Sequence, residues 1–443
     1  MKRIAVIVTL LSLAMTLAAS GAAEDDGKIT ITWWHSNSGV IGEAADVLVE
    51  KFNRTIGEED GIYVEAIYQG SANDTLTKVR TVAQAGDPSM LPDLVQLDST
   101  GVVDMAGNES LYYVEDLAAD QGEDLSFILD HALESMRYRG KVIGLPFNAS
   151  TLLFYYNRTL FDQLGLEAPR TLDDLIKAAP ALIARDDKGN VTRYAIASVP
   201  TTYELCSFIG MQHGLSYITD MSNGHDGTPT RTLFEQDGTL HDFLVKWKEL
   251  YETGGLNNLT SGVSAEFAAG RTASMLASTS NLTSVQEAVG GRFELGVANV
   301  PMVNEDATGG VNLSGGALFT FHKDAQKEKA VWTFMKYLTS AQAQLEWHIA
   351  TGYLPVNKDT YTMQEYIDHT LANPLFKVAS DQLLASNAKV TGLWIPNAYQ
   401  VYYSFQAGIR SMLEEGRDVD ETVSALADEI DGYLDEYHSI NGD

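Results

Sequence analysis

The stretch KITITWW at residues 28–34 alternates β-branched and aromatic side chains with polar ones, which predicts a β-strand. Four segments of alternating type follow it: an amphipathic helix at 39–53, a strand at 61–68, a helix at 74–85 and a buried strand at 92–97. The order strand, helix, strand, helix, strand is typical of a parallel layer in an α/β protein. We therefore expect an α/β fold class.

The rest of the chain keeps this mixed character. Further segments are predicted as strands at 142–147 and 151–156 and as a short helix at 158–164. Thr171 followed by Asp174 resembles a capping box, so we expect a helix from there to about Arg185, kinked at Pro180. Apolar stripes at 330–338 and 419–437 predict two late helices whose stripes belong to the core.

Composition and length exclude several classes of protein. With 443 residues the chain is too long for one ordinary core and fits two compact units, and no long linker separates them. The net charge of -30 repels nucleic acid and anionic lipid, so neither is an expected partner. Cys206 is the single cysteine, which rules out an intrachain disulfide and a cysteine-based zinc site.

The first 23 residues have the order of a secretory signal peptide. Lys2 and Arg3 precede the uncharged apolar run 4–19, and small residues follow at 18–23. The alternative is a transmembrane anchor, for which the run is slightly short of the ~20 residues a span needs. No cysteine near this junction offers a lipid attachment site. We expect an exported, periplasmic protein without a lipid anchor.

Motifs for catalysis, metals or cofactors are missing from the sequence. The nine histidines form no H-x-x-x-H or H-E-x-x-H pair, and there is no G-x-S-x-G elbow and no P-loop. We therefore expect no cofactor and no metal. Asp98 directly follows the buried strand, at the edge where α/β folds bind ligands. A solvated loop residue or helix cap is an equally good interpretation of Asp98.

Aromatic residues beside Gly, Ser and Asn give a modest signal for a binding site. Examples are residues 33–36, Gly352-Tyr353 and residues 392–399. Aromatic rings offer apolar faces to the C–H groups of sugars, while neighbouring amides and hydroxyls offer hydrogen bonds. Any single aromatic residue is more often part of the core, so only the clustering of such loops favours a site.

Short motifs in a fixed order carry a resemblance to a known family. They are Trp34-His35-Ser36, Tyr68-Gln69-Gly70, residues 146–151, Tyr155-Tyr156-Asn157, residues 277–280, residues 314–317 and residues 347–355. In this order they resemble the extracellular solute-binding proteins of carbohydrate ABC importers (family 1), and most of all the glycerol-3-phosphate-binding members. Each motif alone is weak, but together they span nearly the whole mature chain.

The resemblance implies a two-lobe periplasmic-binding-protein fold of type II, similar to maltose-binding protein, with hinge-linked lobes that close on the ligand. It implies three crossings, near Phe147, Val311 and Pro355. The expected division is a signal peptide at 1–23, lobe 1 at 24–147, lobe 2 at 148–311, a return segment of lobe 1 at 312–355 and the end of lobe 2 at 356–443. The expected partner is an ABC permease, and the expected state is a monomer.

Ligand contacts follow from the resemblance where the motifs match. Ser150, Ser278, Gly316 and Tyr353 stand where the glycerol-3-phosphate binders hold their ligand. Ser278-Thr279-Ser280 could also begin a helix whose N–H groups suit an anion or a hydroxyl. We further expect Asp98 or Ser99 to bind hydroxyls. The residues expected to stack on the ligand or enclose it are Trp394, Tyr399 and Tyr203.

Three departures from the family pattern bear on the ligand. A family tyrosine falls on Ala72, a glutamate on Ser99, and the phosphate-pairing arginine on Tyr399. Loss of an arginine that could bind phosphate in a bidentate way weakens the case for a phosphate ligand. A neutral sugar or oligosaccharide therefore ranks slightly above glycerol-3-phosphate, and both stay open.

We expect a binding protein that catalyses no reaction, and two other classes of function are the alternatives. A secreted carbohydrate-active enzyme would need two facing carboxylates about 5–10 Å apart in a cleft, and no local pattern asks for them. A surface lectin or adhesion module is disfavoured because the sequence has no repeats and no anchor.

Overall fold

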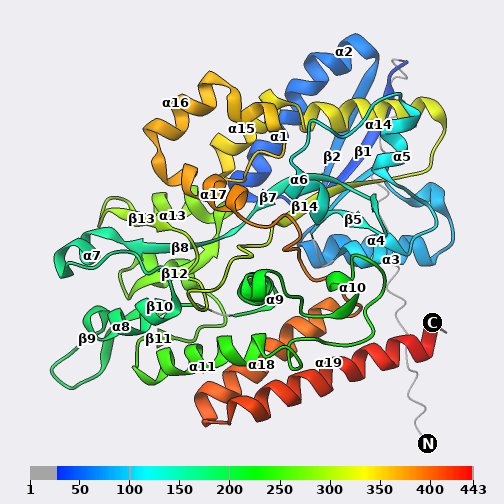
Figure 1. Cartoon of the computed structure of the whole chain (residues 1–443). Coiled ribbons are helices and arrows are strands. Elements are labelled where there is room, and N and C mark those ends of the chain that lie inside the picture. The colour runs from blue at the N-terminus through cyan, green and yellow to red at the C-terminus, as the bar shows by residue number, and fades with distance from the viewer. Residues whose placement is uncertain (1–26, 99–100, 199, 442–443) are drawn as a thin grey trace, which may run out of the picture.

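The computed structural model describes residues 27–98, 101–198 and 200–441, and the predicted signal peptide and Ser99 lie outside these ranges. The chain builds two lobes, each around one six-stranded mixed sheet. In Figure 1 the sheet of lobe 1 lies in the upper part of the molecule and the sheet of lobe 2 below it, with the last two helices along the bottom.

Lobe 1 begins with the parallel layer that the sequence predicts. Its strand order is β2-β1-β3-β14-β4, with β7 also paired to β14. The strands are β1 (Ile29–His35), β2 (Ile62–Tyr68), β3 (Leu94–Asp98), β4 (Leu111–Tyr112), β7 (Leu145–Ser150) and β14 (Ser314–Phe321). Strands β1, β2 and β3 are parallel, whereas β14 runs antiparallel to β3, β4 and β7.

Helices cover lobe 1, and several of them, among them α1, α3 and α14, pack on its sheet. They are α1 (Gly39–Arg54), α2 (Ile56–Asp60), α3 (Ala72–Gln84), α4 (Val102–Ala106), α5 (Val114–Asp120), α6 (Asp130–Ser135), α14 (Ala325–Leu338) and α15 (Ala341–Thr351). The predicted stripe Ala330, Val331, Phe334 and Leu338 on α14 is buried. A short hairpin, β5 (Arg137–Tyr138) with β6 (Lys141–Val142), follows α6.

Lobe 2 has the strand order β11-β10-β12-β8-β13, with β9 paired to β10. Its strands are β8 (Leu152–Asn157), β9 (Ala184–Arg185), β10 (Val191–Ala197), β11 (Leu256–Asn257), β12 (Thr272–Ser278) and β13 (Leu295–Ala298). The helices of this stretch are α7 (Arg158–Leu164), α8 (Leu172–Leu182), α9 (Thr202–Gly210), α10 (Asp220–Asn223), α11 (Thr239–Glu252), α12 (Val263–Ala268) and α13 (Leu282–Val289).

The C-terminal part of the chain is helical. It consists of α16 (Gln364–Ala372), α17 (Pro374–Ala385), α18 (Ala398–Glu415) and α19 (Val419–Asn441), and short 3-10 turns lie at Pro88–Met90, Gln212–Gly214, Thr279–Asn281 and Lys358–Thr362. Helices α18 and α19 pack on each other and on α11. The predicted stripe of α19 is buried from Val419 to Leu434.

Most of the predicted elements are confirmed, but the strand expected at 142–147 is divided between β6 and β7, and one helix ends earlier than expected. The capping box of α8 is present: Asp174 N donates to Thr171 Oγ1 at 3.1 Å, and Thr171 N donates to Asp174 Oδ2 at 3.1 Å. Helix α8 contains Pro180 but stops at Leu182 instead of Arg185. The reason is that residues 184–185 form β9, which pairs with β10.

The chain passes directly from one sheet to the other at Thr151. Strand β7 ends at Ser150 in lobe 1 and β8 begins at Leu152 in lobe 2. Thr279 N donates to Thr151 O at 2.9 Å, so this passage is held by the end of β12. A second passage lies between β13 and β14. Asn357 still bridges to Ile128 of lobe 1, so the third passage lies beyond it.

Gly315 is required where β14 approaches β7. Its φ of +125° belongs to a region that residues with a side chain rarely adopt, and an added Cβ would lie 1.4 Å from the carbonyl oxygen of Asn148. The register of β14 against β7 shifts immediately afterwards, between Gly316 and Ala317. The glycine pair therefore marks a bulge that lets two backbones come close together.

We predict that Gly315→Ala destabilises the protein by roughly 3 kcal/mol or more, because it combines backbone strain with a backbone clash. Urea denaturation measures the loss. Gly432→Ala is the control: Gly432 lies in α19 with open space around its Cα, so this change should stabilise slightly, by roughly 0.5–1 kcal/mol. Equal stability of the two variants would contradict the close approach.

Candidate functional site

The ends of three strands in lobe 1 meet at one place. Gly316 of β14 lies opposite Asp98 of β3 on one side and opposite Asn148 of β7 on the other. Ser314 lies opposite Ser150, whose hydroxyl donates to Ser314 O at 3.4 Å. The predicted residues Asp98, Ser150 and Gly316 are therefore brought together at the edge from which the chain enters lobe 2.

The lobe 2 side of this place is the end of β12. Ser278 is the last residue of β12, and its Oγ lies 3.0 Å from Ser280 Oγ and accepts from Ser280 N at 3.3 Å. A 3-10 turn starts at Thr279 and leads into α13, so the expected helix start is confirmed. Tyr155 donates its hydroxyl to Ser278 O at 2.8 Å and fixes the backbone there.

Tyr353 reaches the site from the turn after α15. Gly352, with a φ of +83°, ends that helix, and Leu354 N donates to Ala149 O at 2.7 Å, which places Tyr353 beside the end of β7. Burial raises the pKa of Tyr353; the nearby side chains of Ser280 and Asn148 act in the opposite direction, and Asp98 adds to the shift. Tyr353 therefore lies among residues of both lobes.

Tyr203 comes from the first turn of α9 in lobe 2. Burial strongly raises the pKa of its hydroxyl, while the nearby side chains of Ser278 and Ser150 act in the opposite direction. Within the part of the chain that the structure describes, the buried hydroxyl oxygen nevertheless has no partner at hydrogen-bonding distance. Ser150, Ser278, Tyr203 and Tyr353 thus form a cluster of hydroxyls that joins the two lobes, and Tyr203 has capacity left for a ligand.

Glu204, the residue after Tyr203, is a carboxylate that the sequence did not single out. It completes a capping box: Thr201 N donates to its Oε2 at 2.8 Å, and Thr201 Oγ1 donates to the same atom at 2.6 Å. Burial raises the pKa of Glu204, and this effect is larger than the lowering of the pKa by these hydrogen bonds. Tyr402 of α18 lies close to Glu204, Thr201 and Tyr399, which brings Tyr399 to the neighbourhood of the cluster.

Trp394 does not stand free for a ligand. Its side chain is 1% exposed, and its ring stacks on His225 with 3.9 Å between centroids. Its backbone N donates to Asn223 O, and the Gly224 Cα lies against it so closely that a Cβ would be 1.9 Å from Trp394 O. Trp394 is therefore a packing residue in the structure, and we leave it out of the proposed site.

Three amide side chains lie behind the hydroxyl cluster, and the sequence did not mark them as a site. Asn37 and Gln96 exchange two hydrogen bonds, of 2.8 and 3.1 Å, and Asn148 Nδ2 lies 3.5 Å from Asn37 Oδ1. All three are buried. The only sequence signal was that Asn148 belongs to the motif at residues 146–151.

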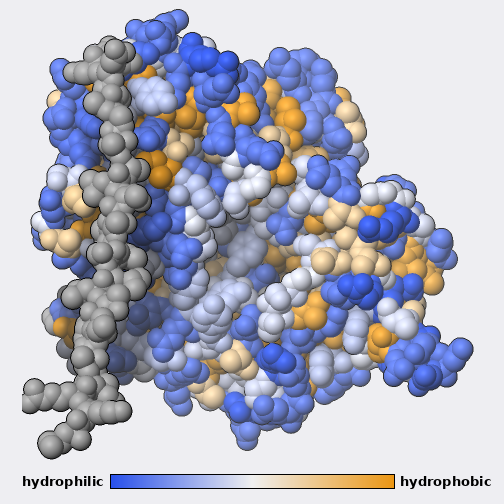
Figure 2. Space-filling model, turned by 180° about the vertical axis from the view of Figure 1, so that it is seen from behind, coloured by the Kyte–Doolittle hydropathy of each residue, from blue (hydrophilic) through white to orange (hydrophobic). Residues whose placement is uncertain are grey.

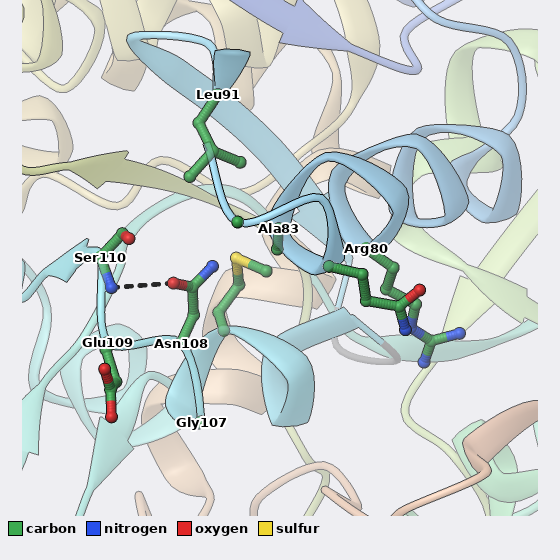
Figure 3. A pocket seen from close by; sticks show the side chains of 10 residues that line it. Arg80, Ala83, Leu91, Gly107, Asn108, Glu109 and Ser110 are labelled. Atoms are coloured by element: carbon green, nitrogen blue, oxygen red, sulfur yellow. Dashed lines mark hydrogen bonds between the residues drawn. The ribbon is translucent and has the colours of Figure 1, made fainter. Parts of the chain in front are cut away.

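Cavities elsewhere in the molecule do not coincide with this cluster. One of them, of about 410 Å³, lies between the end of α3 and the turn before β4. Figure 3 shows it from close by, with the hydrogen bond that Ser110 N donates to Asn108 Oδ1 at 2.8 Å. It contains none of the expected ligand contacts. We place the site at the hydroxyl cluster instead because polar groups of both lobes converge there. Figure 2 shows that the molecule is hollowed near the middle of one face, where weakly polar residues lie.

Within residues 27–98, 101–198 and 200–441, no group of three or more His, Cys, Asp or Glu side chains is arranged to hold a metal ion. In the same ranges, no helix combines the length and the apolar character of a membrane span.

Solved structures share this architecture. UgpB from Mycobacterium tuberculosis in complex with glycerophosphocholine superposes with a TM-score of 0.75 at 23% identity, covering 92% of this chain and 99% of that one. The cyclic alpha-maltosyl-1,6-maltose binding protein of Arthrobacter globiformis gives 0.75 at 21% identity with the same coverage. The sugar-binding protein MalE of Xanthomonas citri gives 0.74 at 19% identity, covering 93% and 99%. The predicted two-lobe fold of the maltose-binding-protein type is confirmed.

Relatives are also found by sequence. The sn-glycerol-3-phosphate-binding periplasmic protein UgpB of Escherichia coli (strain K12) is 25% identical over 388 residues, which cover 85% of each chain. The protein of the same name from Shigella dysenteriae is 26% identical over the same length. The model of one family, described as bacterial extracellular solute-binding protein, matches residues 48–374. With most of its length matched in this way, the chain belongs to the bacterial extracellular solute-binding proteins.

Proposed function

We propose that this solute-binding protein captures a neutral sugar or oligosaccharide between its lobes and delivers it to an ABC permease. The observation that carries the proposal is the cluster of Ser150, Ser278, Tyr203 and Tyr353, whose hydroxyls come from both lobes. Hydroxyl and amide groups can each donate and accept hydrogen bonds, which suits a ligand with many hydroxyls. Gly316 lies beside the cluster, opposite Asp98 and Asn148.

The charges at the cluster favour a neutral ligand. Asp98 acts on the Tyr353 hydroxyl and Glu204 acts on the Tyr203 hydroxyl, and both groups are acidic. Carboxylates accept hydrogen bonds from sugar hydroxyls but repel a phosphate. Tyr399 stands where the resemblance expects a phosphate-pairing arginine, so the usual bidentate partner of a phosphate is replaced by a neutral ring.

Glycerol-3-phosphate or a glycerophosphodiester is the alternative ligand. It is favoured by the names of the relatives, which bind sn-glycerol-3-phosphate, and by the glycerophosphocholine complex of the mycobacterial protein. The choline end of a glycerophosphodiester is cationic and would suit an acidic flank. A bare phosphate monoester lacks that compensation.

Closure of the two lobes around the ligand is the expected mechanism, with the chain passages as hinges. The division of the lobes into 24–147, 148–311, 312–355 and 356–443 stays a prediction. From the positions of the strands, we propose that the first crossing lies at Thr151 and the third lies beyond Asn357. We infer that residues 1–23 direct export to the periplasm and are removed, that the protein acts as a monomer without a lipid anchor, and that it catalyses no reaction.

A ligand panel tests the proposal. Calorimetry with glucose, maltose, maltotriose, glycerol-3-phosphate and glycerophosphocholine should show binding of at least one neutral sugar, and small-angle scattering should show compaction on binding. Binding of the phosphate compounds alone would shift the assignment to the alternative ligand. Hydrolysis of a glycoside during the same incubations would instead support a carbohydrate-active enzyme.

We predict that Tyr399→Arg moves the preference toward phosphate, because it adds the guanidinium that phosphate recognition uses. The ratio of the Kd for maltose to the Kd for glycerol-3-phosphate should rise at least tenfold. Tyr403→Arg is the matched control: it adds the same charge to the same helix at a side chain that is 60% exposed. An equal change in both variants would show that only long-range charge matters.

A further inference from the structure

The Asn148 side chain is held in place by its surroundings on lobe 1. Asn37 Oδ1 accepts from Gln96 Nε2 at 3.1 Å and from Asn148 Nδ2 at 3.5 Å, while Asn37 Nδ2 donates to Gln96 Oε1 at 2.8 Å. These amides come from three segments: the turn after β1, β3 and β7. Together they orient the amide of Asn148 with its nitrogen toward Asn37.

The backbone of Asn148 is fixed as well. Asn148 lies opposite Gly316, and its carbonyl is the group that Gly315 approaches so closely that only glycine fits. The next residue, Ala149, accepts a hydrogen bond from Leu354 N at 2.7 Å. Asn148 is therefore supported from both neighbouring segments and has little freedom to turn its side chain elsewhere.

The side-chain oxygen of Asn148 has no hydrogen-bond partner. Oδ1 is fully buried, the residue is only 5% exposed, and among residues 27–98, 101–198 and 200–441 no donor lies within hydrogen-bonding distance of this atom. The hydroxyl of Tyr353 lies near the same amide. Buried carbonyl oxygens nearly always accept a hydrogen bond. An unpaired one beside the hydroxyls of the proposed site therefore indicates that a donor binds there.

We propose that Asn148 is a specificity-determining residue whose Oδ1 accepts a hydrogen bond from a ligand hydroxyl, an inference that rests on the proposed binding function. An amide oxygen can only accept. The ligand must then carry a donor at this point, as a sugar or another polyol does. A phosphate oxygen of an ionised monoester is itself an acceptor and would leave Oδ1 unpaired.

Asn148→Leu tests this because leucine has nearly the same shape without polar atoms. Removing an unpaired buried acceptor leaves the ligand-free protein as stable or makes it more stable. The same change removes a ligand contact, so the Kd for the best neutral sugar of the panel should rise at least tenfold. Thermal melting without ligand and calorimetry with it measure the two effects, which have opposite directions.

Gln212→Leu is the control for an amide with a structural role. Gln212 is fully buried in lobe 2 and has an unpaired Oε1, but its Nε2 donates to Phe208 O at 2.8 Å and to Thr239 O at 2.9 Å. This variant should melt at a lower temperature and keep the affinity of the wild type.

The two measurements separate failure of this inference from failure of the proposed function. If Asn148→Leu loses as much stability as Gln212→Leu, or if its sugar affinity stays within twofold of the wild type, the inference is overturned. If the wild type binds no sugar of the panel, the proposed ligand class fails. The melting comparison still decides whether the Asn148 oxygen is an unpaired acceptor or part of a structural network.

Discussion

The contact between Gly315 and the Asn148 carbonyl is the constraint on which the site depends. Strand β14 is the element that joins β3 to β7, because it pairs with both. Opposite Gly316 and Ala317, β7 carries one extra residue, Phe147, and this bulge sets which residues of β7 face Ser314 and Gly316, since a slip of one residue would turn every side chain to the other face. A residue with a side chain at position 315 would push the backbones apart and separate the lobe 1 half of the site.

Charge acts on ligand choice at two scales. The whole chain carries a formal charge of -30, so an anionic solute approaches against the field of the protein. Salt screens that field over roughly 10 Å, and the local groups then decide. Those local groups, Asp98 and Glu204, have the same sign as the whole. Both scales therefore oppose a phosphate monoester, although the relatives found by sequence are named for binding one.

The fold could be predicted from the sequence because periodicity and capping are local signals. The parallel layer at 28–97 and the box formed by Thr171 and Asp174 are confirmed, whereas the end of α8 depends on pairing of β9 with a strand further along the chain. The site was harder to predict. Trp394 looks like a ligand platform in the sequence, but its face is covered by His225, which is 169 residues away. The role proposed for Asn148 depends on its contact with Asn37, which is itself paired with Gln96, and both partners are far from Asn148 in the sequence.

The proposed binding and the proposed closure both involve the unpaired atoms at the junction. Asn148 Oδ1, Thr151 Oγ1 and Tyr203 Oη are all buried and have no hydrogen-bond partner among the described residues. They lie on lobe 1, on the passage and on lobe 2 respectively. A ligand that satisfies the first and the last of these must contact both lobes at once. Because it binds the closed arrangement better than an open one, it shifts the population toward closure by that difference in affinity. A ligand that leaves Asn148 unpaired gains less from closing, so discrimination between solutes and the closing motion have the same physical origin.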